Sequence, residues 1–219
     1  MLYARRIGTA LGEMLVAVDD ADALVALEFC ANARPEDLLA HVTRPDETVE
    51  WSDERGKAVV AQLEEYFRGE RRAFDLALAP RGSEFQRRVW QELTRIPYGT
   101  TISYGELARR VGKRSATASR AIGQANASNP IAVVVPCHRV IGHDGRLTGY
   151  AAGLSFKAKL LTLEGALAPD ELIAPRSHRA IQQAHAHAGG PPRAARVRER
   201  PARAIRPGSP DQADLFPPS

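Results

Sequence analysis

The stretch Ile131–Val140 constrains this chain more than any other, because it sets an apolar run directly against a proline and a cysteine. Its sequence is Ile-Ala-Val-Val-Val-Pro-Cys-His-Arg-Val. The β-branched run predicts a buried strand, and Pro136 cannot continue a central ladder, so we expect the strand to end there. Cys137 would then lie at the end of a rigid element, beside His138 and Arg139. Because nearby positive charge lowers the pKa of a thiol, we interpret Cys137 as a nucleophile; the alternative is an inert core cysteine.

Composition places the chain among ordinary globular proteins. It has 219 residues, of which 44% are hydrophobic and 26% charged, enough for one large domain or two small ones. Two cysteines do not make a disulfide framework, so we expect a cytoplasmic protein. Charged residues interrupt the chain between Met1 and Cys30, which argues against a secretory signal or a membrane span.

The positive charge is concentrated at the C-terminal end. The whole chain carries +4, yet the segment 176–219 alone holds eight Arg against three acidic residues, so the remainder is nearly neutral. Any DNA binding by the body must therefore come from a local patch. The Arg/Pro/Ala-rich composition of 169–219 predicts a disordered tail.

Residues 1–80 predict a small α/β domain. Two apolar runs separated by an aspartate-rich turn indicate a hairpin, and Pro80-Arg81-Gly82 marks the boundary with the next domain. Cys30 closes the second run and is interpreted as a core residue. The expected elements are strands at 11–18, 24–30 and 74–78, a short helix at 35–40, and a longer helix capped by Ser52 and ended by Gly69.

Residues 81–168 predict a mostly α domain with a helix-turn-helix and the short strand described above. Ser83 and Ser103 are good N-caps, the latter in a capping box with Glu106. A second helix from about Ser115 to Ala127 completes the helix-turn-helix. Its small residues suit either a tightly packed core helix with Arg120 reaching solvent, or a helix pressed into a groove. We favour the groove, given the capped helix before it and the candidate nucleophile after it.

The last predicted helix is capped by Ser155 and ends near Glu164. A carboxylate at a helix C-terminus is unfavourable to the helix dipole, so we expect Glu164 to have another partner.

Several of these motifs occur together in one known family. The chain resembles the O6-alkylguanine-DNA alkyltransferases, bacterial type, across roughly 83–166, and more loosely across 1–80, where the family has a ribonuclease H-like domain. The motifs that carry the resemblance are Ile102-Ser-Tyr104, Ser119-Arg-Ala-Ile-Gly123, Asn129-Pro130, Pro136-Cys-His-Arg-Val140, Gly149-Tyr150 and Leu161-Thr-Leu-Glu-Gly165.

The resemblance implies direct-reversal DNA repair. Cys137 would attack the alkyl carbon of O6-alkylguanine, activated through His138, a water and Glu164. O4-alkylthymine is a possible second substrate. Tyr104 would turn the phosphate backbone and donate a hydrogen bond to the guanine, and Asn129 would hold the hinge before the active-site strand. Because an S-alkyl-cysteine has no good leaving group, we expect one irreversible, stoichiometric transfer per molecule.

The resemblance also implies how double-stranded DNA is held. The helix-turn-helix would enter the minor groove, and Arg120 would fill the space left by the flipped nucleotide. The residues implied in DNA binding are Ala118, Ser119, Arg120 and Tyr104. Those implied in reading the flipped base are Val140, Tyr150, Ala151 and Ala152, where Ala152 is expected to disfavour large substituents.

We expect no cofactor and a monomer. Cys30 and His41 do not make a four-ligand set, so we also expect no metal. Gln212-Ala-Asp-Leu215-Phe216 resembles the short peptides that dock on bacterial sliding clamps, which makes a clamp a candidate partner.

Two alternative functions use the same residues. A non-catalytic helix-turn-helix lesion sensor or regulator would not need Cys137. A cysteine hydrolase would pair Cys137 with His138, but adjacent residues on an extended segment point to opposite faces, which counts against that pair.

Overall fold

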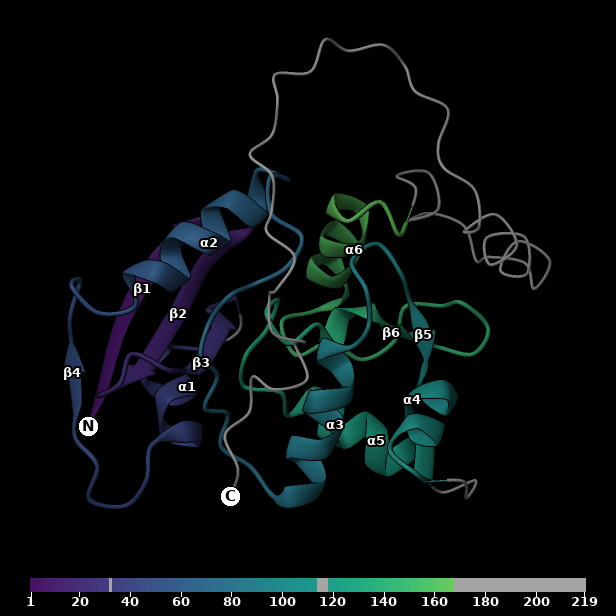
Figure 1. Cartoon of the computed structure of the whole chain (residues 1–219), viewed down its shortest axis with the longest axis horizontal. Helices are drawn as coiled ribbons and strands as arrows, with labels where there is room; N and C mark the ends of the chain where they lie inside the picture. Colours follow the sequence, from purple (N-terminus) through teal and green to yellow (C-terminus); the bar gives the residue numbers. More distant parts are fainter. Residues whose placement is uncertain (32, 114–117, 168–219) are drawn as a thin grey trace, which may run out of the picture.

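The computed structural model describes residues 1–31, 33–113 and 118–167. In Figure 1 a sheet with two helices occupies one side, and a mostly helical half packs beside it.

The N-terminal half is built on a four-stranded sheet in the order β3-β2-β1-β4. Strands β1 (Leu2–Thr9), β2 (Gly12–Asp19) and β3 (Leu24–Phe29) form an antiparallel meander, and β4 (Val49–Trp51) pairs parallel to β1. The predicted hairpin is confirmed. The pairing of β1 with β2, whose register extends over the whole of β1, was not predicted.

One helix covers each face of this sheet. Helix α1 (Pro35–Val42) buries Leu38, Leu39 and Val42 against one face. Helix α2 (Lys57–Phe67) buries Val59, Leu63 and Tyr66 against the other. Both helices were predicted, α2 from its apolar spacing.

The C-terminal half begins with α3 (Glu84–Thr94), whose Trp90 is fully buried and donates to the carbonyl of Ala125 at 2.8 Å. The strand β5 (Ile102–Ser103) leads into α4 (Tyr104–Arg110), and α5 (Ala118–Ala127) packs against α3 and α4. A 3₁₀ turn, η1 (Cys137–Arg139), then β6 (Val140–Ile141) and α6 (Leu154–Leu163) complete the half. The two helices of the predicted helix-turn-helix are therefore present, and residues 114–117 between them lie outside the described residues.

The predicted strand over Ile131–Val135 is wrong, although its burial is confirmed. Only Ile131 makes a bridge, to Leu27 of β3. The chain then folds into tight turns: the amide of Val134 donates to the carbonyl of Ala132 at 2.8 Å, and Val133 has a left-handed φ of 71°. Apolar periodicity cannot tell such a buried turn from a buried strand.

The side chain of Asn129 supplies the hydrogen bonds that a neighbouring strand would otherwise have supplied. Its amide nitrogen donates to the carbonyls of Val135 at 2.8 Å and Ile131 at 3.3 Å, and its oxygen accepts from the amide of Ile131 at 3.1 Å. The buried polar backbone is satisfied without a ladder.

Three other local predictions are wrong. Ser52 and Ser155 do not cap helices, because α2 starts after Gly56 and α6 after Gly153, both of which have positive φ. In the segment 74–78 Phe74, Leu76 and Leu78 are buried and alternate with exposed residues, but the segment forms only a bridge from Leu78 to Leu24 and no strand.

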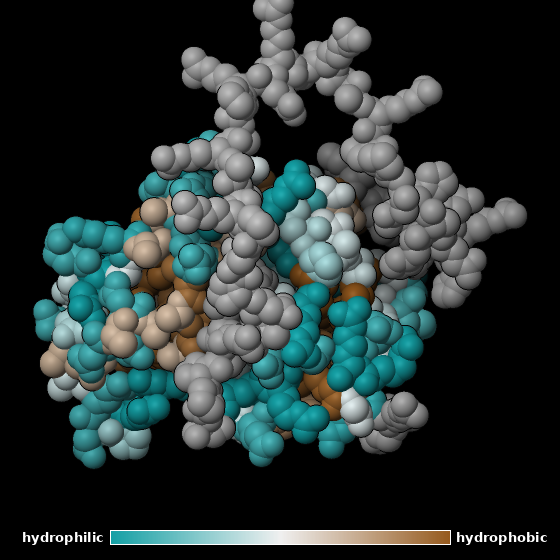
Figure 2. Space-filling model, viewed as in Figure 1, coloured by the Kyte–Doolittle hydropathy of each residue, from teal (hydrophilic) through white to brown (hydrophobic). Residues whose placement is uncertain are grey.

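The two halves share one hydrophobic core. The same buried cluster contains Met14 and Leu27 from the sheet, Trp90 and Leu93 from α3, and Val135 beside the active-site turn. Around the grey atoms, hydrophilic residues cover most of the face seen in Figure 2, and hydrophobic residues show in smaller areas between them. Within the part of the chain that the structure describes, no helix is both long and apolar enough to cross a bilayer.

The N-cap of α3 gives a stability prediction with an internal control. The Ser83 hydroxyl accepts from the amide of Gln86 at 3.3 Å, and the Gln86 side chain bonds back to the amide of Ser83 at 2.8 Å. Ser83→Ala should lower the free energy of unfolding by about 1 kcal/mol in urea titrations.

Ser52→Ala is the control, because Ser52 looks like a cap in the sequence but caps nothing in the structure. It should change the free energy of unfolding by less than about 0.5 kcal/mol. Equal losses in the two variants would contradict the assignment of the α3 cap.

Candidate active site

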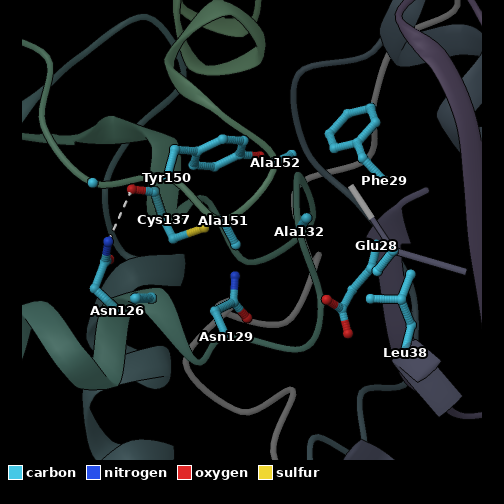
Figure 3. Close-up of a pocket in the computed structure, with 13 residues that line it drawn as sticks. Glu28, Phe29, Leu38, Asn126, Asn129, Ala132, Cys137, Tyr150, Ala151 and Ala152 are labelled. Atoms are coloured by element: carbon cyan, nitrogen blue, oxygen red, sulfur yellow. Dashed lines mark hydrogen bonds between the residues drawn. The ribbon is translucent and has the colours of Figure 1, made fainter. Parts of the chain in front are cut away.

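A pocket joins the thiol of Cys137 to both halves of the molecule (Figure 3). Its walls come from the 126–132 segment, the Gly149–Ala152 loop and the edge of the N-terminal sheet. Cys137 is buried, with 6% of its surface exposed, and the structure places it together with Asn129, Tyr150, Ala151 and Ala152 as the sequence analysis expects.

The local turns hold Cys137 in place. The amide of Cys137 donates to the carbonyl of Val135 at 2.8 Å across Pro136, and its own carbonyl accepts from the Asn126 side chain at 3.4 Å. Figure 3 draws this last bond and shows the sulfur pointing between Tyr150 and Asn129. Asn126 was not singled out from the sequence.

The expectation of a lowered thiol pKa from His138 and Arg139 is not met in this structure. Burial raises the pKa of Cys137, while a hydrogen bond from Asn129 and the charge of Lys157 oppose the rise. The guanidinium of Arg139 is paired with Glu164, and burial lowers the pKa of His138, which is therefore neutral. The cation that acts on the thiol is Lys157.

Glu164 is the centre of a buried hydrogen-bond network. It accepts from Arg139 through two nitrogens at 2.8 and 2.9 Å, from the Tyr66 hydroxyl at 2.7 Å, and from the amide of Gly99 at 3.3 Å. His138 Nε2 lies 3.0 Å from the same carboxylate. Burial alone would raise the pKa of Glu164, but hydrogen bonds from His138 and Arg139 hold it at about 2.

This network fixes the proton on His138. Because Glu164 is ionised and can only accept, Nε2 of the neutral imidazole must donate to it. The lone pair then lies on Nδ1, which is buried and makes no hydrogen bond to any described residue. The ring is therefore a proton acceptor on its Nδ1 side, held by a carboxylate on its other side.

Lys157 was missed because a lysine in an amphipathic helix is normally solvent-exposed. Here it is fully buried, and its ammonium donates to the carbonyls of Val140 and Thr148, each at 2.6 Å. Burial lowers its pKa to about 8. By holding these two carbonyls, Lys157 fixes the loop that carries Tyr150 against the active-site turn.

A second, open groove lies on the outer face of α4 and α5. It is lined by Tyr104, Ser119, Arg120 and Gly123, with His143 on the opposite wall. Ser119 and Arg120 are exposed, while Ile122 and Ala125 turn into the core. The first alternative for α5, a tightly packed helix with Arg120 reaching solvent, describes this structure, while the insertion of α5 into a groove stays a prediction.

The remaining predicted residues are only partly covered. Ala118 begins α5, and Val140 is buried at the start of β6. The clamp-like residues Gln212, Leu215 and Phe216 lie outside the described residues. In the described ranges no three His, Cys, Asp or Glu side chains gather closely enough to hold a metal ion.

The buried Glu164–Arg139 pair predicts a large and pH-dependent stability effect. Glu164→Gln leaves Arg139 buried without a counter-charge and should cost about 3 kcal/mol or more at pH 7. The pKa of Glu164 is lowered from 4.5 to about 2, so its stabilisation is complete above pH 4.5 and is lost as the pH falls toward 2. Unfolding measured from pH 7 to pH 2 should show the two proteins converging.

Glu54→Gln is the matched control, because Glu54 is 82% exposed in its ion pair with Lys57. It should leave the free energy of unfolding unchanged within error across the same pH range, because solvent screens an exposed ion pair. A Glu164→Gln loss that stays constant down to pH 2 would contradict the lowered pKa.

Comparison with known proteins identifies the family. Residues 84–166 match the 6-O-methylguanine DNA methyltransferase DNA binding domain, and residues 2–80 match the ribonuclease-like domain of the same family. The methylated-DNA–protein-cysteine methyltransferase of Methanosarcina acetivorans is 55% identical over 121 residues, which cover 55% of this chain and 76% of that protein. The protein of the same name from Mycobacterium bovis is 48% identical over 137 residues, covering 62% and 81%.

Solved structures agree. The crystal structure of Mycobacterium tuberculosis O6-methylguanine methyltransferase has 40% sequence identity and a TM-score of 0.66, covering 78% of this chain and 98% of that one. A structure of the same protein in complex with DNA has 39% identity and a TM-score of 0.64, covering 78% and 97%. With both domain models and these relatives in agreement, the chain belongs to the methylated-DNA–protein-cysteine methyltransferase family.

Proposed function

We propose that this protein repairs DNA by moving the alkyl group of O6-alkylguanine onto the sulfur of Cys137. The observation that carries the proposal is the placement of one thiol at the buried end of a pocket, next to a neutral histidine held by an ionised glutamate. Family membership and the DNA complex of the mycobacterial relative support it.

The proton of the thiol has a defined destination. Nδ1 of His138 carries the lone pair and takes the proton of the thiol. As the resemblance implies, the proton passes through a water. Glu164 stabilises the imidazolium that forms. Because the thiol pKa is raised by burial in the free protein, Cys137 stays protonated until it is used. Because the thiolate is the reactive form, a protonated Cys137 does not react before a lesion arrives.

The transfer step balances without a cofactor. The sulfur electron pair forms the S–C bond while the C–O6 bond breaks, and the electrons of that bond stay with the guanine. The guanine takes up one proton, so the net change replaces the hydrogen of the thiol by the alkyl group. The product is a thioether, which offers no easy leaving group, so each molecule reacts once.

The flipped base would be read by the walls of the pocket. Tyr150 lines the pocket beside Cys137, and Ala151 and Ala152 leave backbone groups accessible at its mouth. Tyr104 reaches the same loop, with its hydroxyl 3.3 Å from the carbonyl of Thr148. We assign to Tyr104 a hydrogen bond to the guanine as charge develops on it, and to Asn129 the fixing of the turn that carries the nucleophile.

The open groove of α4 and α5 would meet the duplex. Its small, exposed outer face lets the helix backbone approach DNA closely, and Arg120 is the long cationic side chain on that face. In this arrangement Ala118 and Ser119 would approach the backbone of the minor groove while Arg120 takes the place of the flipped nucleotide.

The experiment uses duplex DNA with a single O6-methylguanine carrying a labelled methyl group. The full chain should take up at most one equivalent of label, and peptide mass spectrometry should find one methyl group on Cys137. Cys137→Ala should take up none, because no other described thiol lines the pocket.

Cys30→Ser is the matched control and should retain transfer, since burial raises the pKa of Cys30 to about 11 and leaves it unreactive. Uptake beyond one equivalent, label on Cys30, or full activity of Cys137→Ala would each overturn the proposal. A wild-type protein that binds the lesion but takes up no label would also overturn the proposal, and it would favour the non-catalytic lesion sensor.

A further inference from the structure

The acceptor pocket has one charged wall that the transfer chemistry does not use. Glu28, on β3 of the N-terminal sheet, lines the same pocket as Cys137. Figure 3 shows Glu28, Phe29 and Leu38 across the pocket from the sulfur, beyond Ala132. The Glu28 side chain is half-buried, and no described residue forms a hydrogen bond or an ion pair with its carboxylate.

The shape of the pocket brings longer substituents toward this wall. A methyl group is transferred to the sulfur and does not reach the rest of the pocket. A longer O6 substituent has to continue away from the sulfur, into the rest of the pocket. Ala132, which Figure 3 shows between the sulfur and Glu28, has a small side chain and leaves the direction toward Glu28 open.

We propose that Glu28 determines which O6 substituents the protein accepts, by rejecting those that end in a negative charge. Neutral substituents and those ending in an amine are accepted, while a carboxymethyl group is disfavoured. This inference rests on the alkyl transfer to Cys137 proposed above and adds the substrate class of that site.

Among the described residues, the two cations near the pocket are already held by other groups and do not pair with an incoming carboxylate. The ammonium of Lys157 is held by the carbonyls of Val140 and Thr148, and Arg139 is paired with Glu164 away from the pocket. Two like charges in a partly buried site repel each other more strongly than in water, because the effective dielectric constant is lower. We expect about a tenfold penalty in rate for a carboxylate substituent.

The discrimination should depend on pH. Burial raises the pKa of Glu28 to about 7, so the repulsion is weak below that pH and develops above it. Among the described residues, the other titratable side chains that line the pocket are Cys137 and Tyr150, both with raised pKa values. Cys30, just after β3, interacts electrostatically with Glu28 and has a pKa raised to about 11. Lys157, whose charge acts on Cys137, has a pKa lowered to about 8. Loss of the Lys157 charge at higher pH would also disfavour a carboxylate substituent. A variant without Glu28 is therefore needed to separate the effect of Glu28 from that of Lys157.

The test compares two lesions of the same shape. Duplex DNA carries either O6-carboxymethylguanine or its neutral amide, O6-carbamoylmethylguanine, and single-turnover rate constants for transfer to Cys137 are measured with the full chain. At pH 8 the ratio of amide to acid rates should be about tenfold larger for the wild type than for Glu28→Gln. At pH 6 the two ratios should converge.

Glu36→Gln is the control for a general change of charge. Glu36 is an exposed carboxylate on α1, the helix that carries Leu38, and it does not line the pocket. Its amide-to-acid ratio should equal that of the wild type. Glu28→Met, neutral and of similar length, should repeat the result of Glu28→Gln with different packing.

The amide-to-acid rate ratio tests the role of Glu28, and transfer from O6-methylguanine tests the proposed function, so the two can fail independently. Equal ratios in the wild type, Glu28→Gln and Glu28→Met at pH 8 would overturn the role of Glu28 while transfer itself remained intact. Absence of transfer from O6-methylguanine would instead reject the function on which the inference rests. Glu28→Gln is expected to fold, because it removes a half-buried carboxylate whose ionisation burial makes unfavourable.

Discussion

The carboxylate of Glu164 is the interaction on which the rest of the active site depends. It accepts hydrogen bonds from Tyr66 on α2, from the amide of Gly99 after α3, and from His138 and Arg139 on the turn that follows Cys137. The carboxylate therefore connects the end of its own helix, α6, to three other segments. Because those donors come from both halves, the orientation of the histidine beside the thiol is fixed by the whole tertiary structure and not by its own short turn.

Local sequence signals predicted part of the local structure. Ser83 and Ser103 cap helices as expected, whereas Ser52 and Ser155 do not, because glycines with positive φ precede α2 and α6. The position of Glu164 at a helix end, unfavourable to the dipole, correctly indicated a partner elsewhere. Cys137 and His138 were found from their immediate neighbours, and the structure brings His138 and Glu164 together.

Features that depend on contacts between distant segments were not predictable. The apolar run Ile131–Val135 has the composition of a strand, but Asn129 satisfies its backbone and lets it turn, which no periodicity reveals. The thiol pKa was expected to fall because Arg139 is adjacent in sequence, whereas that guanidinium turns toward Glu164. Glu28 reaches the pocket from β3, more than a hundred positions from Cys137 along the chain, and only the packing of the two halves shows it.

The free edge of β3 is closed by segments from outside the sheet. The amide of Leu27 donates to the carbonyl of Pro130 at 2.8 Å, and its carbonyl accepts from the amide of Ala132 at 2.7 Å. Leu24 is bonded in the same way to the segment around Leu78. The sheet edge thus supports the turn that carries the nucleophile, and an edge that would otherwise be open to other strands is covered.

These hydrogen bonds limit how the two halves of such a protein can be exchanged between relatives. The backbone of Leu27 in the N-terminal half bonds to Pro130 and Ala132 in the C-terminal half, so each half depends on the surface of the other. A chimera that took its first 80 residues from a relative would take from that relative both the strand that contacts this loop and the residue at position 28. Its catalytic turn would then be positioned, and its lesion preference set, by the donor of the half that contains no nucleophile.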